Sequence, residues 1–137
     1  MRVLLDTNVI LDVGLQRQPF YSLAVAVIEA SDFDTRHLFI TASMATDVYY
    51  LMRKAKGREQ ALDFLRDLLD VVDVCQVDRS TLQVALNSDF PDFEDAVQNA
   101  AAVRHEIDVI VTRNKADYRS SPLPVLTLDE FVAAHLA

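Results

Sequence analysis

The chain has 137 residues, with 13 Lys and Arg against 21 Asp and Glu, so its formal net charge is −8 at pH 7. This length is typical of one domain and predicts a single domain over residues 1–137 with one hydrophobic core. Hydrophobic residues make up 51% of the chain and charged residues 25%, a balance that excludes an intrinsically disordered protein. The acidic charge argues against a protein that coats nucleic acid or anionic membranes through diffuse positive charge, but it leaves room for a local basic patch.

We expect neither a signal peptide nor a membrane-spanning helix in this sequence. The apolar run at residues 3–5 is too short for a signal peptide, and no apolar run reaches the roughly eighteen residues that a membrane helix needs. The single cysteine, Cys75, lies in an apolar stretch and cannot form an intramolecular disulfide, so we expect a buried, reduced thiol. We therefore expect a cytoplasmic protein without membrane contacts.

The chain opens with a short apolar run followed by polar residues. Residues 2–6 are typical of a buried strand, and Thr7 or Asn8 provides a cap for a short helix that Gly14 ends. Polar groups are thereby placed at the carboxyl end of a strand.

The rest of the chain alternates between helical periodicity and short β-branched or apolar runs. In chain order, the sequence predicts a helix over 20–30, a polar turn over 31–36, a strand over 38–41, helices over 43–57 and 58–69, a strand over 71–77, helices over 80–87 and 93–105, strands over 108–112 and 124–126, and a last helix from 127. Capping-box spacing begins at Ser80 and again at Thr127. Strands separated by helices predict an α/β fold with a parallel sheet.

Asp6 interrupts the end of the first predicted strand. A carboxylate near a core is costly unless it is paired, hydrogen-bonded or bound to a metal ion. Capping the next helix would account for Asp6, although Thr7 and Asn8 are equally suited to that role. Ligands of parallel sheets gather beyond the carboxyl ends of the strands, where we expect Asp6 and the residues after Thr112.

Asp47 lies on a predicted helix among apolar and aromatic side chains. Its neighbours at helical spacing are Met44, Val48, Tyr50 and Leu51. We expect this stripe to face the protein interior, so Asp47 needs a partner. A hydrogen bond to a neighbouring tyrosine or to the backbone explains it as well as a functional role does.

Two further clusters carry oxygen ligands. Residues 89–95 hold four acids. Favourable interactions with the helix dipole explain only some of them. Asp92 and Asp95 share a helix face, and the repulsion between them suggests a bound cation. Residues 112–118 mix hydroxyl, amide, carboxylate and basic groups, for which a solvated loop is an alternative explanation. Because the three histidines show no zinc spacing, Mg²⁺ or Mn²⁺ fits this donor set better than Zn²⁺.

Four sequence blocks, in order and at matching spacing, resemble those of PIN-domain proteins. They are LLDTNVILD at 4–12, SMATDVYY at 43–50, DFEDA at 92–96 and VTRNKADY at 111–118. The branch of the family with FEDA in its third block is the most similar. The resemblance implies a three-layer α/β/α sandwich with a central, mainly parallel sheet. It also implies metal-dependent endoribonuclease activity, as in the VapC-type toxins of bacterial and archaeal toxin–antitoxin pairs, together with a cognate antitoxin partner and a homodimer.

The resemblance also assigns roles to residues. Asp6 and Asp95 match the metal-binding aspartates of the first and third blocks. Asp47 stands where glutamate is usual and is one methylene shorter. Asn114 stands where many members have aspartate, so either Asn114 or Asp117 acts as the ligand of the fourth block.

The resulting hypothesis places four acids in a catalytic site that uses Mg²⁺ or Mn²⁺. Asp6 and Asp95 hold the tightly bound ion, and Asp47 holds or orients a second ion or a metal-bound water. Asp117 completes the cluster. The polar side chains expected to support these ligands are Thr7, Asn8, Asp92, Thr112 and Asn114.

An acidic enzyme that cleaves a polyanion also needs local positive charge. We expect RNA-backbone contacts from Arg53, Lys54, Arg113 and Lys115. For the first two, complementing the dipole of the helix that ends before Gly57 is an equally good explanation. The helical hairpin at 49–69 offers a dimer surface, but it would also serve as core.

Two other functions stay open at this point. The first is a catalytically weak, PIN-like RNA-binding or regulatory protein, which the replacements at Asp47 and Asn114 favour. The second is an unrelated α/β phosphohydrolase or interaction domain whose acids only cap helices.

Overall fold

The computed structural model of the chain describes residues 1–31 and 37–136. Its strands form one parallel sheet in the order β3-β2-β1-β4-β5. These strands are β1 (Arg2–Leu5), β2 (His37–Thr41), β3 (Asp73–Cys75), β4 (Val109–Val111) and β5 (Val125–Leu126). The predicted parallel sheet is therefore confirmed.

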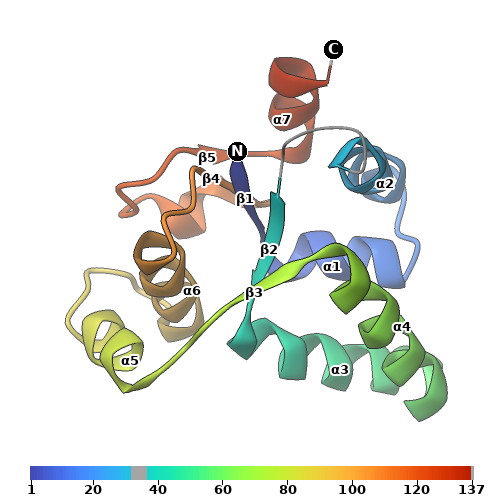
Figure 1. Ribbon diagram of the computed structural model, residues 1–137, viewed down its shortest axis with the longest axis horizontal. Helices are drawn as coiled ribbons and strands as arrows, with labels where there is room; N and C mark the ends of the chain where they lie inside the picture. The colour runs from blue at the N-terminus through green and yellow to red at the C-terminus, as the bar shows by residue number, and fades with distance from the viewer. Residues whose placement is uncertain (32–36, 137) are drawn as a thin grey trace.

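Helices cover both faces of the sheet. They are α1 (Thr7–Gly14), α2 (Phe20–Ser31), α3 (Ala42–Lys56), α4 (Arg58–Val71), α5 (Arg79–Leu86), α6 (Phe93–Arg104) and α7 (Leu128–His135), with a 3₁₀ turn, η1, at Lys115–Tyr118. Helices α5 and α6 lie on one side of the sheet, and α1 to α4 lie on the other (Figure 1). This arrangement confirms the three-layer α/β/α sandwich. No helix within the described residues is long and apolar enough to cross a membrane.

The core forms because the central strands are apolar along their whole length. Val3, Leu4 and Leu5 are fully buried, as expected for a parallel strand that is covered on both faces. Gly14 lies at a close contact between helices. A Cβ atom there would lie 2.7 Å from the Met52 Sδ and 3.1 Å from the Phe64 ring, so a side chain at this position would force these residues to shift.

Several element boundaries differ from the sequence prediction. The strand expected over 71–77 is confined to β3, because α4 continues to Val71. The helix expected to be capped from Ser80 is capped by Asp78, whose carboxylate accepts from the Thr81 backbone N–H while the Thr81 side chain closes the capping box. The capping box at Thr127 is confirmed. The polar turn expected over 31–36 lies outside the described residues except for Ser31, which ends α2.

The chain order of the strands creates a crevice at one edge of the sheet. Strands β1 and β4 are neighbours in the sheet. After β1 the chain continues to β2 on one side, and after β4 it continues to β5 on the other side, so the two connections run in opposite directions. Ligands of open α/β sheets bind at such a switch point, beyond the carboxyl ends of the strands. Asp6 follows β1, and Thr112 follows β4, so both lie at this point.

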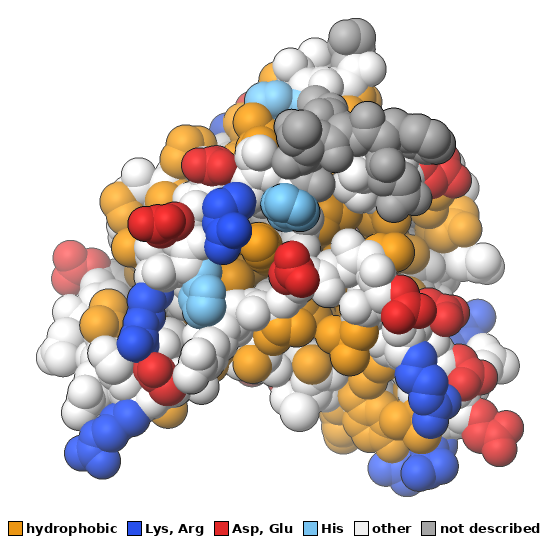
Figure 2. Space-filling view, viewed as in Figure 1, with side chains coloured by type: hydrophobic (Ala, Val, Ile, Leu, Met, Phe, Trp, Pro, Cys, Tyr) orange, Lys and Arg blue, Asp and Glu red, His pale blue; other side chains and the backbone are white. Residues whose placement is uncertain are grey.

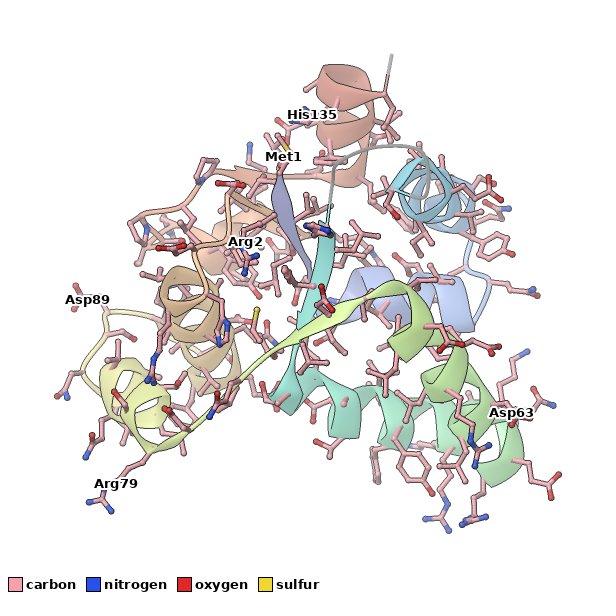
Figure 3. All side chains as sticks on the ribbon, in the orientation of Figure 1. Met1, Arg2, Asp63, Arg79, Asp89 and His135 are labelled. Carbon is pink, nitrogen blue, oxygen red and sulfur yellow. The ribbon has the colours of Figure 1, made fainter. Side chains whose placement is uncertain are left out.

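The surface is hollowed between the two arms of the molecule. Figure 2 shows the hollow at the lower edge, between the part that carries α5 and α6 and the part that carries α3 and α4. Acidic residues also lie far from the sheet: Asp63 on α4, and Asp89 in the loop before α6 (Figure 3).

Candidate functional site

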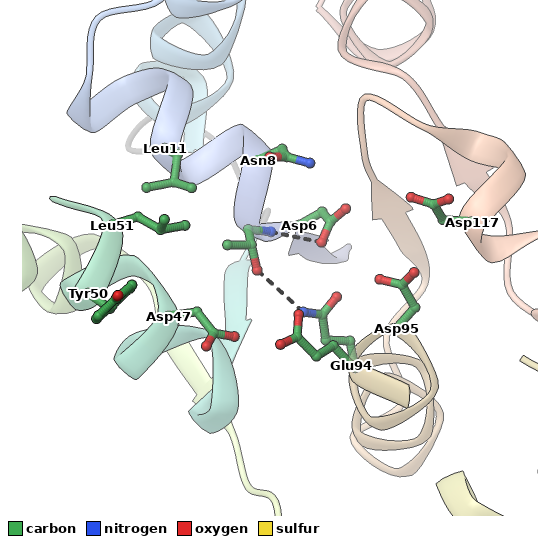
Figure 4. A pocket seen from close by; sticks show the side chains of 11 residues that line it. Asp6, Asn8, Leu11, Asp47, Tyr50, Leu51, Glu94, Asp95 and Asp117 are labelled. Carbon is green, nitrogen blue, oxygen red and sulfur yellow. Dashed lines mark hydrogen bonds between the residues drawn. The ribbon is translucent and has the colours of Figure 1, made fainter. Parts of the chain in front are cut away.

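A pocket of about 380 Å³ lies at the carboxyl edge of the sheet (Figure 4). It is lined by Asp6, Thr7, Asn8, Leu11, Asp47, Tyr50, Leu51, Glu94, Asp95, Gln98 and Asp117. We call it the acidic pocket, because carboxylates reach it from the end of β1, from α3, from α6 and from η1. The structure thus brings together the four acids that the sequence analysis singled out, Asp6, Asp47, Asp95 and Asp117.

Asp6 is held in place by three hydrogen-bond donors. Its Oδ1 accepts from the Thr7 backbone N at 2.8 Å and from the Tyr118 hydroxyl at 3.1 Å, and its Oδ2 accepts from the Thr112 hydroxyl at 2.8 Å. Burial raises the pKa of this carboxyl, and the same hydrogen bonds oppose the rise. Asp6 is also the N-cap of α1, so the same residue caps this helix and lines the pocket.

Asp95 stands in the first turn of α6 and is half-buried. Asp92 caps this helix by accepting from the Asp95 backbone N at 3.0 Å. Burial, and then repulsion by Asp92, Asp6 and other carboxylates, raises the pKa of Asp95 to about 7. A cation bound nearby would relieve this repulsion and favour the ionised form.

Asp47 faces Glu94 across the pocket (Figure 4). Repulsion by Asp47, followed by burial, raises the pKa of Glu94. Within the described residues, no hydrogen bond or ion pair to Asp47 is present, so the expected tyrosine or backbone partner is not found there. Asp47 is therefore an available acceptor that faces the pocket.

The stripe around Asp47 is only partly internal. Met44 and Val48 are fully buried, as expected, but Tyr50 is 64% exposed and Leu51 40% exposed. The expectation that Tyr50 and Leu51 face the interior is therefore wrong. Both line the acidic pocket, because α3 extends past the edge of the sheet.

Asp117, and not Asn114, lines the acidic pocket. The Asn114 side-chain amide donates to Asp117 Oδ1 at 3.1 Å, and its backbone N donates to the Thr112 hydroxyl at 3.1 Å. Asn114 thus orients Asp117 from outside the pocket. The stretch expected as a solvated loop contains the ordered turn η1.

Gln98 and Tyr118 belong to the site but were not predicted from the sequence. Gln98 is 3% exposed and its Nε2 donates to the Thr7 hydroxyl at 3.3 Å, while its Oε1 lies within hydrogen-bond distance of the buried Tyr118 hydroxyl. The signal for Gln98 is its position: it is polar in an alanine-rich helix, one turn after Glu94 and Asp95.

The predicted RNA-binding residues lie outside the acidic pocket. Arg113 donates to Asp12 Oδ1 at 2.9 Å, and its guanidinium lies 4.1 Å from the centre of the Phe20 ring. Lys115 pairs with Glu130. The remaining two, Arg53 and Lys54, are exposed in the last turn of α3.

The donor set of the acidic pocket fits a hard divalent cation that keeps part of its water shell. The side-chain atoms in its lining that could ligate a metal ion are oxygens, which suits Mg²⁺ or Mn²⁺. Within the described residues, no three His, Cys, Asp or Glu lie close enough to hold one ion together. Mg²⁺ sites commonly use one or two carboxylates plus several waters, and the pocket meets this requirement.

Comparisons with known proteins agree with the fold. The chain is 26% identical over 138 residues to "Ribonuclease VapC1" from Aquifex aeolicus (strain VF5), a match that covers 95% of this chain and 92% of that protein. Among solved structures, VapBC2 from Rickettsia felis, bound to a promoter DNA fragment, matches with a TM-score of 0.71 at 15% identity, covering 93% and 98% of the two chains. A toxin–antitoxin complex from Klebsiella pneumoniae matches with a TM-score of 0.69 at 21% identity, covering 92% and 97%.

A third structure, the toxin VapC20 of Mycobacterium tuberculosis, described as cleaving the sarcin–ricin loop, has a TM-score of 0.63 at 17% identity and covers 79% of this chain and 86% of its own. The sequence model of the PIN domain matches residues 2–116, a range that includes Asp6, Asp47 and Asp95. This match covers more than half of the chain, and the strand order and layers agree with the fold that the resemblance implied. The chain belongs to the PIN-domain family.

Proposed function

We propose that this protein is a metal-dependent endoribonuclease that hydrolyses RNA phosphodiester bonds. The observation that carries the proposal is the acidic pocket, in which Asp6, Asp47, Asp95 and Asp117 converge from four separate segments. Membership of the PIN-domain family and the similarity to a protein named ribonuclease VapC1 support the same activity.

In this proposal, Asp6 and Asp95 hold Mg²⁺ or Mn²⁺. Asp47 and Glu94 line the same pocket and would orient a water molecule beside the ion, and Asp117 completes the acidic rim. When bound, the ion stabilises charge on the phosphate oxygens and lowers the pKa of the attacking water.

The surrounding residues fix these carboxylates before substrate arrives. Thr112 and Tyr118 donate to different oxygens of Asp6, so the carboxylate cannot rotate freely. Asn114 restrains Asp117 through its side-chain amide. Fixed oxygens lose little entropy on binding an ion, and they would keep that ion in one position.

Positive charge for the RNA backbone is proposed at the rim of the molecule. Arg53, Lys54 and Lys115 are exposed, although Lys115 also pairs with Glu130. Exposed basic side chains contact phosphates without reading the base sequence. Arg113 is a weaker candidate, because its guanidinium is paired with Asp12.

A cognate antitoxin and a homodimer are proposed as partners. Solved structures of similar fold include complexes described as VapBC or toxin–antitoxin, which supports an antitoxin partner for this chain. The α3–α4 hairpin exposes Tyr50, Leu51 and Leu69 and is the proposed dimer surface.

A non-cleaving RNA-binding protein is the second candidate. It is favoured by the separation of the carboxylates, no three of which meet at one ion within the described residues. Metal-stimulated turnover separates the two functions.

Cleavage of labelled single-stranded RNA with Mg²⁺, Mn²⁺ or EDTA tests the proposal. Cleavage that needs metal and is lost in folded Asp6→Asn and Asp95→Asn variants would establish the nuclease and two of its ligands. Asp89→Asn is the matched control, because Asp89 is an exposed acid of the cluster at residues 89–95 that does not line the pocket (Figure 3). Cleavage that survives both pocket substitutions would refute the assignment.

A further inference from the structure

A second pocket opens directly beside the acidic pocket. This side pocket, of about 250 Å³, is lined by Ser43, Thr46, Asp47, Val77, Leu82, Phe93, Glu94, Val97 and Gln98. Asp47, Glu94 and Gln98 line both pockets. The two pockets are therefore adjacent, and one ligand that occupied both would contact these three side chains.

The chemistry of the two pockets differs. Whereas the acidic pocket is dominated by carboxylates, the side pocket has apolar walls from Val77, Leu82 and Val97. Its polar groups are the hydroxyls of Ser43 and Thr46 and the shared side chains of Asp47, Glu94 and Gln98. A flat, apolar group with polar edges matches this lining better than a phosphate or a sugar does.

Phe93 gives the side pocket an aromatic face. It stands in the first turn of α6, next to Glu94 and Asp95, and 49% of its surface is exposed. A half-exposed phenylalanine contributes little to the core, but it offers a ring on which a planar group can stack. Because Phe93 directly precedes Glu94 and Asp95 in α6, its ring lies close to carboxylates that line the acidic pocket.

We propose that the side pocket binds one unpaired nucleobase of single-stranded RNA, stacked on Phe93, while the adjoining phosphate occupies the acidic pocket. The inference rests on the proposed function, since it assumes that RNA is the substrate. Recognition of single-stranded RNA commonly combines stacking on aromatic side chains with contacts to splayed bases. A base that is paired in a duplex cannot enter a pocket of this kind without unpairing, so the site selects single strands.

The hollow in the molecular surface gives such a strand its path. The side pocket is formed between the start of α3 on one arm and α5 and α6 on the other, which border the hollow in Figure 2. A strand that lies along this hollow passes the carboxyl edge of the sheet. The side pocket thus selects the base next to the scissile phosphate.

The test measures whether Phe93 and one base act together. Binding of a short fluorescent single-stranded RNA is measured with Mg²⁺ in the Asp95→Asn background, which is used to prevent cleavage, and an abasic nucleotide is moved along the RNA one position at a time. Phe93→Ala should weaken binding of the intact RNA roughly 5- to 150-fold, the range expected for loss of one stacked base. At one position only, the abasic nucleotide should reduce the effect of Phe93→Ala to less than about twofold.

Controls separate stacking from a general loss of apolar surface. Phe93→Trp should retain binding and Phe93→Leu should not, because only tryptophan keeps an aromatic face. Val103→Ala removes an exposed apolar side chain near the other end of the same helix and should leave binding unchanged. An equal effect of Phe93→Ala on intact RNA and on every abasic RNA would overturn the base pocket.

The outcome also distinguishes this inference from the proposed function. If Phe93 is coupled to one base but the wild type cleaves no RNA, the base pocket is supported and the nuclease function is refuted. Metal-dependent cleavage by the wild type without coupling at any position would do the reverse.

Discussion

Asp12 carries the most deeply buried charge in the described part of the chain. Its Oδ1 accepts from Arg17 Nε and from Arg113 at 2.9 Å each, and the residue is fully buried. Its Oδ2 and the Arg17 Nη2 are buried without a hydrogen-bond partner among the described residues. The pairing ties the loop after β4 to the end of α1. Because Arg113 directly follows Thr112, this loop also carries a donor to Asp6.

Removing this carboxylate should destabilise the protein strongly. Asp12→Ala leaves two guanidinium groups without their anion. Because both are partly exposed to water, the loss of these charged hydrogen bonds should cost about 1.5–3 kcal/mol. Urea unfolding measures the change in the free energy of unfolding. Asp63→Ala is the control, since Asp63 pairs with Arg66 on an exposed helix surface and should change stability by less than about 0.5 kcal/mol. A loss below about 1 kcal/mol for Asp12→Ala would mean that water reaches the pair.

The raised pKa of Asp95 predicts how the stability of the metal-free protein depends on pH. Its pKa is about 7 in the folded protein against 3.8 for the unperturbed group, so the folded state binds the proton more tightly than the unfolded state does. The stabilisation from this proton is complete below pH 3.8 and is lost as the pH rises to about 7. Asp95→Asn should abolish this loss in EDTA.

Urea unfolding at several pH values between 4 and 8 measures this effect. The wild type and the exposed control Asp89→Asn should lose stability more steeply with pH than Asp95→Asn. Parallel curves for all three proteins would show that Asp95 titrates near its ordinary pKa.

The position of α5 depends on its N-terminal cap. Asp78 Oδ1 accepts from the Thr81 backbone N at 3.0 Å and also pairs with Arg104 of α6. This carboxylate therefore holds together two helices that border the side pocket.

Replacing the cap should separate its two contributions. Asp78→Ala removes the acceptor for the helix N-terminus and should lower the melting temperature of the protein. Asp78→Asn keeps a capping oxygen and loses only the partly exposed ion pair, so it should lower the melting temperature less than half as much. Thermal unfolding of both variants provides the comparison, and equal losses would mean that the Arg104 pair, and not the cap, stabilises α5.

The elements themselves were largely predictable, because their patterns are local. The apolar runs around Val3 and Ile110 form strands since a doubly covered parallel strand needs apolar side chains on both faces. The capping residue of a helix was harder to predict where several residues that can cap lie close together in the sequence. Ser80 has capping-box spacing, but Asp78 is the residue whose backbone leaves the helix and whose carboxylate reaches Thr81. Only the three-dimensional path of the chain decides between such neighbours.

The acidic pocket shows what whole-molecule geometry adds to sequence patterns. The resemblance in four blocks predicted that Asp6, Asp47, Asp95 and Asp117 would gather, and the strand order brings their segments to one edge. Glu94 and Gln98 were missed because no local pattern shows which face of α6 meets α1 and α3. Tyr118 was missed because an aromatic residue after a polar turn usually belongs to the hydrophobic core. The hydrogen bond from its hydroxyl to Asp6 joins residues that are 112 positions apart in the sequence.

The net charge of −8 and the clustered acids together predict that a divalent cation stabilises the whole fold. An ion that binds only the folded state adds about 2.7 kcal/mol at a concentration one hundred times its dissociation constant, so the melting temperature should rise with Mn²⁺ or Mg²⁺ until the site is saturated. Asp6→Asn and Asp95→Asn should reduce this rise, while Asp89→Asn should retain it, because Asp89 is exposed and outside the pocket. A rise of equal size in all four proteins would place the cation elsewhere on the acidic surface. A rise confined to the wild type and Asp89→Asn would locate it between β1 and α6, where the two carboxylates meet.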